Sequence, residues 1–136
     1  MSTKRHYQDA LLRVAALLPN AATTVNSNAI DLGANPAFTL EKVQVKLSTT
    51  AGNGANNKNI NLVLQHSGEA GANFTNISKV AAPVLTVVDA NNAGYAAGEE
   101  VVYLPPDAKR YIRASATGEA NGGNAANGSF ELVLLF

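Results

Sequence analysis

The chain contains no cysteine and no tryptophan, and only 6% of its residues are aromatic. Without cysteine, neither a disulfide framework nor a thiolate zinc site can form. Ten basic and ten acidic side chains leave a formal net charge of zero, so the basic surface needed to bind nucleic acid or an anionic membrane is missing. No stretch approaches the roughly 20 apolar residues that span a bilayer. We therefore expect a soluble protein that binds neither nucleic acid nor membrane.

What the chain does contain fits a single domain. Its 136 residues are enough to bury a core without disulfides. Apolar residues make up 46% of the chain, but alanine dominates this share, so the core is expected to be thin and built mainly from valine, leucine and isoleucine. The N-terminus resembles a secretory signal in its basic start and apolar continuation. Asp9 and Arg13 interrupt the apolar run, so we do not interpret it as a signal.

The N-terminal region has the spacing of a short amphipathic helix. Four apolar side chains recur at intervals of three or four residues: Tyr7, Leu11, Val14 and Leu18. Pro19 ends this pattern. We therefore predict a helix or arm over residues 1–20, ahead of a β domain over residues 21–136.

Beyond this region the apolar runs are short, often alternate with polar residues and are separated by Asn, Gly and Pro, which is typical of β-strands. Seven segments are predicted to be strands: 25–32, 38–48, 60–66, 84–88, 99–104, 111–117 and 130–136. In the second of these the apolar parity changes, so a β-bulge is predicted near Glu41 and Lys42. Seven strands favour an antiparallel β-sandwich.

The C-terminal strand has the clearest alternation. Phe130, Leu132, Leu134 and Phe136 share one face, and the segment is predicted to form a hairpin with the strand that starts at Tyr111. Two Asn- and Gly-rich linkers, 51–59 and 119–128, are likewise predicted to be exposed hairpin tips. A solvated turn is the simpler interpretation of each tip, and a contact surface is the alternative.

Two patterns resemble chemical sites without completing one. The segment from Asp89 to Glu100 has much of the spacing of an EF-hand calcium loop, but Ala93 offers no side-chain oxygen at the fifth position and the flanks are β-like. His66 and Ser67 are neighbours at a predicted strand end, where a lone histidine is expected to be solvated. Adjacent strand residues point to opposite faces, so the two cannot readily act as base and nucleophile. We therefore predict no enzyme, no metal and no cofactor.

Lys109, Arg110 and Arg113 form the densest basic group within the β region. In a regular strand, Arg110 and Arg113 are predicted to emerge on opposite faces. Two interpretations stay open at this point. One is a charge paired within the chain, with Asp107 or Glu131, and the other is a salt bridge to an acidic partner.

Five parts of the chain follow one another in a familiar order. They are Asn26–Gly33, Leu62–Ser67, Asn73–Phe74, Leu104–Pro105 with Lys109–Arg113, and the final apolar strand. Together they resemble the tailed-bacteriophage capsid cement proteins of the Bordetella-phage type, from about Val25 to the end of the chain. The resemblance implies a jelly-roll β domain, made in the bacterial host cytoplasm, that sits on the exterior of the phage head and clamps neighbouring major capsid proteins without catalysis. The N-terminal region and the Asn-rich tips depart from the family pattern.

The first hypothesis is therefore a virion protein that cements a bacteriophage capsid as a homo-oligomer, with a dimer favoured over a trimer and no small-molecule substrate. Its candidate contacts with the capsid or with a sister subunit are Lys4, Arg5, Tyr7, Leu11, Val14, Leu18, Arg110 and Arg113. An N-terminal helix that only caps its own sandwich is the simpler alternative. The second hypothesis is a carbohydrate-binding or adhesive β-sandwich with polar tips, which the scarcity of aromatic side chains disfavours.

Overall fold

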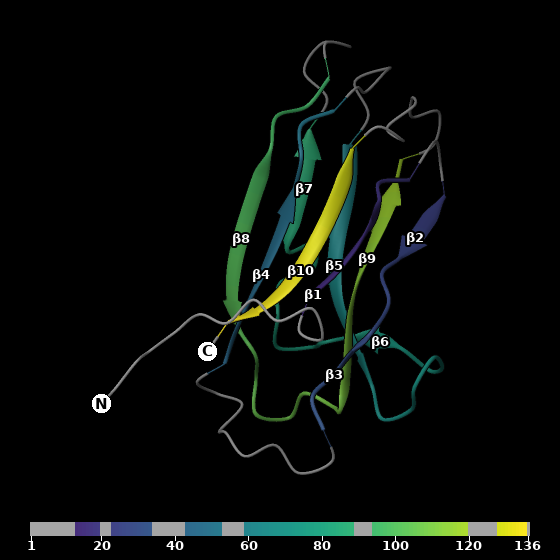
Figure 1. Cartoon of the computed structure of the whole chain (residues 1–136), viewed down its shortest axis with the longest axis vertical. Helices are drawn as coiled ribbons and strands as arrows, with labels where there is room; N and C mark the ends of the chain where they lie inside the picture. The colour runs from purple at the N-terminus through teal and green to yellow at the C-terminus, as the bar shows by residue number, and fades with distance from the viewer. Residues whose placement is uncertain are drawn as a thin grey trace, which may run out of the picture.

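The computed structural model describes residues 13–19, 23–33, 43–52, 59–88, 94–119 and 128–135. These residues form ten strands and no helix, which confirms the predicted all-β fold (Figure 1). The strands are β1 Arg13–Leu17, β2 Thr24–Asn26, β3 Ile30–Asp31, β4 Gln44–Thr49, β5 Asn59–Ser67, β6 Thr75–Asn76, β7 Leu85–Val88, β8 Gly98–Tyr103, β9 Tyr111–Gly118 and β10 Ser129–Leu135.

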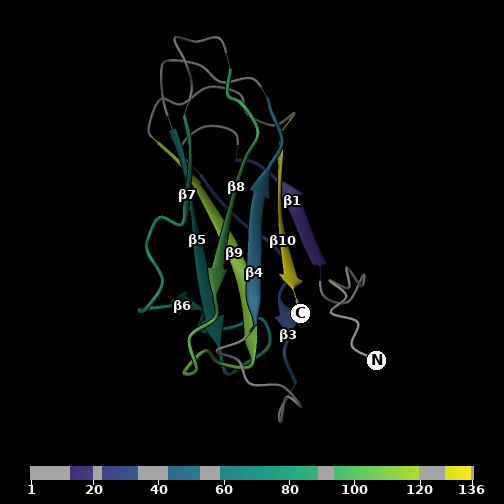
Figure 2. The ribbon, with the colours of Figure 1, turned by 90° about the vertical axis from the view of Figure 1, so that its left-hand side faces the viewer.

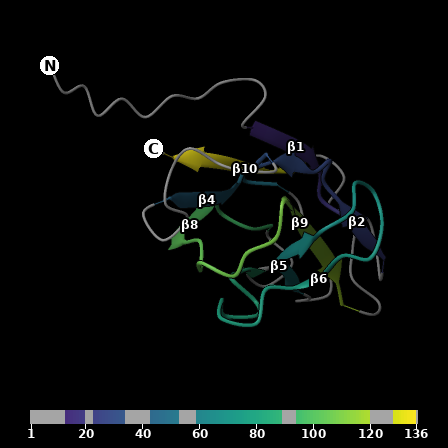
Figure 3. The same cartoon turned by 90° about the horizontal axis from the view of Figure 1, so that it is seen from below.

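The strands form two antiparallel sheets. Sheet A has the order β1-β10-β4-β8, and sheet B has the order β2-β9-β5-β6, with β3 also paired to β9 and β7 to β5. Seen from below, sheet A and sheet B lie as two layers against each other (Figure 3). The result is a β-sandwich, as the number and spacing of the strands predicted.

The core lies between the sheets and follows the period of two expected of half-buried strands. In β10, Phe130, Leu132 and Leu134 face inward and are at most 1% exposed, so the predicted inward face of this strand is confirmed. In sheet B, Leu62 and Ile112 are fully buried against them in the same apolar cluster. Each such side chain stabilises the fold by about 1.5–3 kcal/mol relative to an exposed one. The predicted inward position of the last residue, 136, lies outside the described residues.

The predicted N-terminal helix is wrong from residue 13 onward. Residues Arg13–Leu17 form β1, which pairs antiparallel with β10 at the edge of sheet A. Val14 packs against the core and Leu18 is buried in it, because positions 14, 16 and 18 also have the period of a strand. The β domain therefore begins by residue 13, and the boundary predicted after residue 20 falls inside it. The remainder of the predicted helix, residues 7–12, lies outside the described residues.

The predicted hairpins are also wrong, because the chain crosses between the sheets where a hairpin was expected. β9 pairs with strands of sheet B, whereas β10 pairs with β1 and β4 of sheet A. The other Asn-rich linker likewise joins β4 of sheet A to β5 of sheet B. A strand with one apolar face fits either sheet, so alternation alone does not select its partner. The predicted bulge near residues 41 and 42 lies outside the described residues, as do residues 53–58 and 120–127.

Candidate functional site

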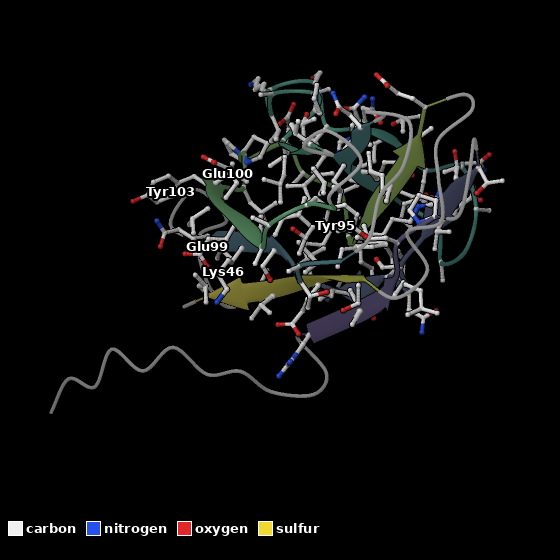
Figure 4. The ribbon with its side chains drawn as sticks, turned by 90° about the horizontal axis from the view of Figure 1, so that it is seen from above. Lys46, Tyr95, Glu99, Glu100 and Tyr103 are labelled. Atoms are coloured by element: carbon white, nitrogen blue, oxygen red, sulfur yellow. The ribbon has the colours of Figure 1, made fainter. Side chains whose placement is uncertain are left out.

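Among the described residues, no group of three or more histidine, cysteine or acidic side chains could hold a metal ion. The first part of the calcium-like segment, residues 89–93, lies outside them. Its last two acids, Glu99 and Glu100, lie side by side in β8, where they point to opposite faces of sheet A (Figure 4). The described part of the chain also has no helix that is long and apolar enough to cross a membrane.

His66 is buried, which corrects the expectation of a solvated side chain. Its Nδ1 accepts a hydrogen bond from the backbone N–H of Lys109 at 3.2 Å. Burial, and then the nearby Lys109 cation, lowers the pKa of His66 below its ordinary value of 6.5. The Ser67 hydroxyl donates to the carbonyl of Ala72 and accepts from the N–H of Glu69. His66 therefore holds the connection between β8 and β9, and Ser67 holds the turn that follows β5.

Arg110 is paired within the chain, but not with the predicted acids. Its Nε and Nη2 donate to the two carboxylate oxygens of Asp31 at 2.8 and 3.0 Å. Hydrogen bonds from Arg110 and from the Gly33 N–H lower the pKa of Asp31. The two predicted partners bind other cations, since Asp107 lies 4.0 Å from Lys79 and Glu131 pairs with Arg13. Arg110 thus fastens the short strand β3 to the start of β9.

Arg113 lies on the outer face of sheet B and is held from two sides. Its Nε donates to Oε1 of Gln65 at 2.9 Å, and its Cζ lies 4.1 Å from the centroid of the Phe74 ring. The amide of Gln65 donates in turn to Oδ1 of Asn76 at 3.2 Å. A stacked and hydrogen-bonded guanidinium is a stable surface element, and its contacts are already made inside this chain.

The structure separates the predicted N-terminal contacts into two groups. Val14 and Leu18 contribute to the core of their own sandwich, so they are not available to a groove on a partner. Leu18 is only 2% exposed, and its N–H donates to the carbonyl of Gly128 at 2.9 Å. The other predicted contacts, Lys4, Arg5, Tyr7 and Leu11, lie outside the described residues.

The surface that sequence reasoning missed is the edge of sheet A along β8, which we call the β8 edge. β8 pairs with β4 on one side and with no other strand of the described residues (Figure 2). Val101 is 40% exposed and Tyr103 is 63% exposed, and both share the outer face with Glu99. Lys46 lies on the same face, opposite Val101 in β4 (Figure 4).

Part of the backbone of the β8 edge is directed away from β4. The N–H of Leu104 donates to the carbonyl of Val43 at 2.9 Å, which fixes this residue pair as a hydrogen-bonded one. Because such pairs alternate in an antiparallel ladder, the N–H and C=O groups of Glu99, Val101 and Tyr103 point away from β4. An extended segment laid along β8 could therefore bond to three residues in turn.

The side chains of this edge carry two negative charges. Within the described residues, no hydrogen bond or ion pair engages the carboxylate of Glu99 or of Glu100, and both residues are exposed. Glu100 has the inward parity of the strand, a placement that discourages unspecific pairing at a sheet edge. A shallow depression of about 310 Å³ lies at the start of β8, lined by Ser48, Thr49, Ala97, Gly98 and Glu99.

The sequence did hold a signal for this surface. The segment from Glu99 to Tyr103 begins a predicted strand with two adjacent acids, one of which must have the inward parity, and this would be unusual in a central strand. Only the pairing order of the sheet, however, identifies β8 as an edge strand.

Comparison with known proteins assigns the chain to no family. No family model matches the sequence, and no curated protein matches it. Among solved structures, the chain is similar to the crystal structure of murine APRIL at pH 5.0. The two are 11% identical with a TM-score of 0.39, and the match covers 91% of this chain and 98% of that one.

Proposed function

We propose that this protein binds the exterior of a bacteriophage head and cements neighbouring major capsid proteins. The observation that carries the proposal is the antiparallel two-sheet sandwich, which agrees with the fold implied by the sequence resemblance to phage cement proteins. Fold agreement alone does not select a function, so the proposal rests on the resemblance and the fold together.

The outer face of sheet A at its β1 edge supplies a surface suited to this role. Leu17 is 60% exposed there, and Ala15 beside it leaves the backbone accessible. Because Leu18 forms a hydrogen-bonded pair with Gly128, the N–H and C=O groups of Arg13, Ala15 and Leu17 point away from β10. A capsid strand could pair along this edge while an apolar side chain packs on Leu17.

Cementing is a matter of linked binding equilibria. A protein that binds assembled capsid subunits and not separated ones stabilises the shell, by about 2.7 kcal/mol per site when its free concentration is 100 times the Kd. Many copies act on one shell, so a modest affinity per copy is sufficient. This role requires contact area and surface complementarity rather than reactive groups.

The test is co-sedimentation of the purified protein with phage heads that lack it. The expected result is saturable binding at a fixed number of copies per capsid protein, together with a higher temperature of head disruption. Leu17→Asp should weaken binding, whereas Val88→Asp should not, because Val88 is similarly exposed, at 57%, but lies on β7 of sheet B.

Protein that stays in the supernatant with intact heads would rule out the capsid assignment. In that case a glycan array would decide whether the carbohydrate-binding alternative survives. Equal binding by the two Asp variants would leave the cement role standing but remove the β1 edge as the contact.

A further inference from the structure

We propose that the β8 edge binds the N-terminal segment, residues 1–12, of a second copy of this chain, with Lys4 and Arg5 placed against Glu99 and Glu100. This proposal concerns how two copies associate, and it does not depend on binding to phage heads. Reciprocal exchange of the segments between two copies would give a symmetric dimer.

The first argument is the backbone of β8. Three of its residues, Glu99, Val101 and Tyr103, direct N–H and C=O groups away from β4, and no strand of the described residues pairs with them. An added strand would satisfy these groups and bury part of the exposed Val101 and Tyr103 side chains. The edge is therefore suited to an extended segment rather than to a helix.

The second argument is charge complementarity. Glu99 and Glu100 are consecutive, so one carboxylate lies on each face of the sheet (Figure 4). Lys4 and Arg5 are also consecutive, so in an extended conformation they would place one cation on each face. The two cations would face the two carboxylates whether the added strand ran parallel or antiparallel to β8. Opposite charges that face each other across two strands are favourable.

A β8–β8 pairing between two copies is the obvious competitor. It would bring four carboxylates into one two-stranded ribbon, while the segment Gly98–Tyr103 contributes no cation to balance them. Like charges would then lie on neighbouring strands, which is destabilising where they come close, since physiological salt screens exposed charges only beyond about 8 Å. The basic N-terminal segment avoids this repulsion.

The length of the segment allows the exchange. Twelve residues precede Arg13, and an extended chain of that length spans roughly 40 Å. β1 and β8 are opposite edges of sheet A, about three strand spacings or 14 Å apart. To reach its own β8, the segment would have to cross the strands β10 and β4, pass Lys46 of like charge and then turn.

The test is the mass of the purified protein in solution, measured by analytical ultracentrifugation over a range of concentrations. The expected mass is twice the 14.1 kDa of one chain, and deletion of residues 1–12 should give a monomer. A monomeric full-length protein, or a dimer that survives the deletion, would overturn the proposal. Raising the salt concentration should weaken the dimer, because the proposed pairs are exposed.

Charge reversal provides the sharper test. We expect Glu99→Lys with Glu100→Lys to raise the dimer Kd by at least about tenfold, since attractive pairs become repulsive in both halves of the dimer. The matched control is Asp107→Lys with Glu119→Lys, which makes the same change in net charge at other exposed sites and should leave the Kd within about twofold. Equal effects of the two double variants would refute the assignment to the β8 edge.

A mixture of two charge-reversed variants tests whether the N-terminal segment pairs with the β8 edge of another copy. Lys4→Glu with Arg5→Glu should also abolish the dimer, yet an equimolar mixture of this variant with the Glu99→Lys, Glu100→Lys variant should form a heterodimer. Each segment then meets a β8 edge of opposite charge. A chain carrying all four substitutions should again form a homodimer, because its segment and its β8 edge have opposite charges. A mixture or a four-fold variant that stays monomeric would refute the exchange. These assays contain no phage heads, so they test the dimer independently of the proposed cement role.

Discussion

Leu18→Ala should destabilise the fold by about 3 kcal/mol, within the 2–5 kcal/mol that buried leucines lose on truncation to alanine. Leu18 is 2% exposed in the core, and it packs closely on Gly128, since a Cβ built on that glycine would lie 2.9 Å from its Cδ1. The surroundings have little room to collapse into the space left behind. The loss corresponds to a decrease in Tm of about 10 °C for a domain of this size.

The matched control is the preceding leucine. Leu17 is 60% exposed on the outer face of β1, so Leu17→Ala should change the free energy of unfolding by less than about 0.5 kcal/mol. Urea denaturation followed by circular dichroism measures both variants against the parent chain. Equal effects of the two substitutions would refute the alternation of β1, and with it the assignment of this segment to sheet A.

Two further predictions concern the glycine beside Tyr95 and the buried histidine. Gly128→Ala should lower the free energy of unfolding by about 1–3 kcal/mol, because the added Cβ would lie 2.5 Å from the Tyr95 hydroxyl. Gly68→Ala is the control, since its added Cβ meets nothing within 4 Å and it should be nearly neutral in the same denaturation assay. In the folded protein the pKa of His66 lies below its ordinary value of 6.5. Near and below pH 6.5 the unfolded chain therefore binds more protons at this residue than the folded chain does, so the free energy of unfolding should fall as the pH drops through 6.5. His66→Asn should reduce the dependence of the free energy of unfolding on pH, measured by urea denaturation between pH 5 and 8, whereas His6→Asn should not. An unchanged pH dependence in His66→Asn would contradict the lowered pKa of His66.

Much of the fold was predictable because strands with one buried face leave a strong mark on the sequence. The alternation of Phe130, Leu132 and Leu134 predicted β10 and its inward face, and short apolar runs between Asn- and Gly-rich linkers predicted most of the other strands. The segment around β1 was misassigned, because spacings of three and four from Tyr7 to Leu18 coincide with a period of two over positions 14, 16 and 18. Alanine, frequent there, does not favour a strand over a helix.

The candidate surfaces were harder to predict because they depend on pairs far apart in the sequence. Asp31 and Arg110 are 79 residues apart, and only the pairing of β3 with β9 brings them together. The two predicted partners, Asp107 and Glu131, pair with Lys79 and Arg13 instead. Local spacing carries no information about contacts that the sheet order creates.

By itself, the sequence determined that the body of this protein is β-structured and which faces of its longer strands are apolar. These properties follow from side-chain period and composition, which act locally. Only the tertiary structure decided that β9 and β10 belong to different sheets, that β1 and β8 are the edges of sheet A among the described strands, and that Glu99 and Glu100 lie on one of these edges. Pairing partners and edges depend on how all the strands share one core, and no single segment of the chain encodes them.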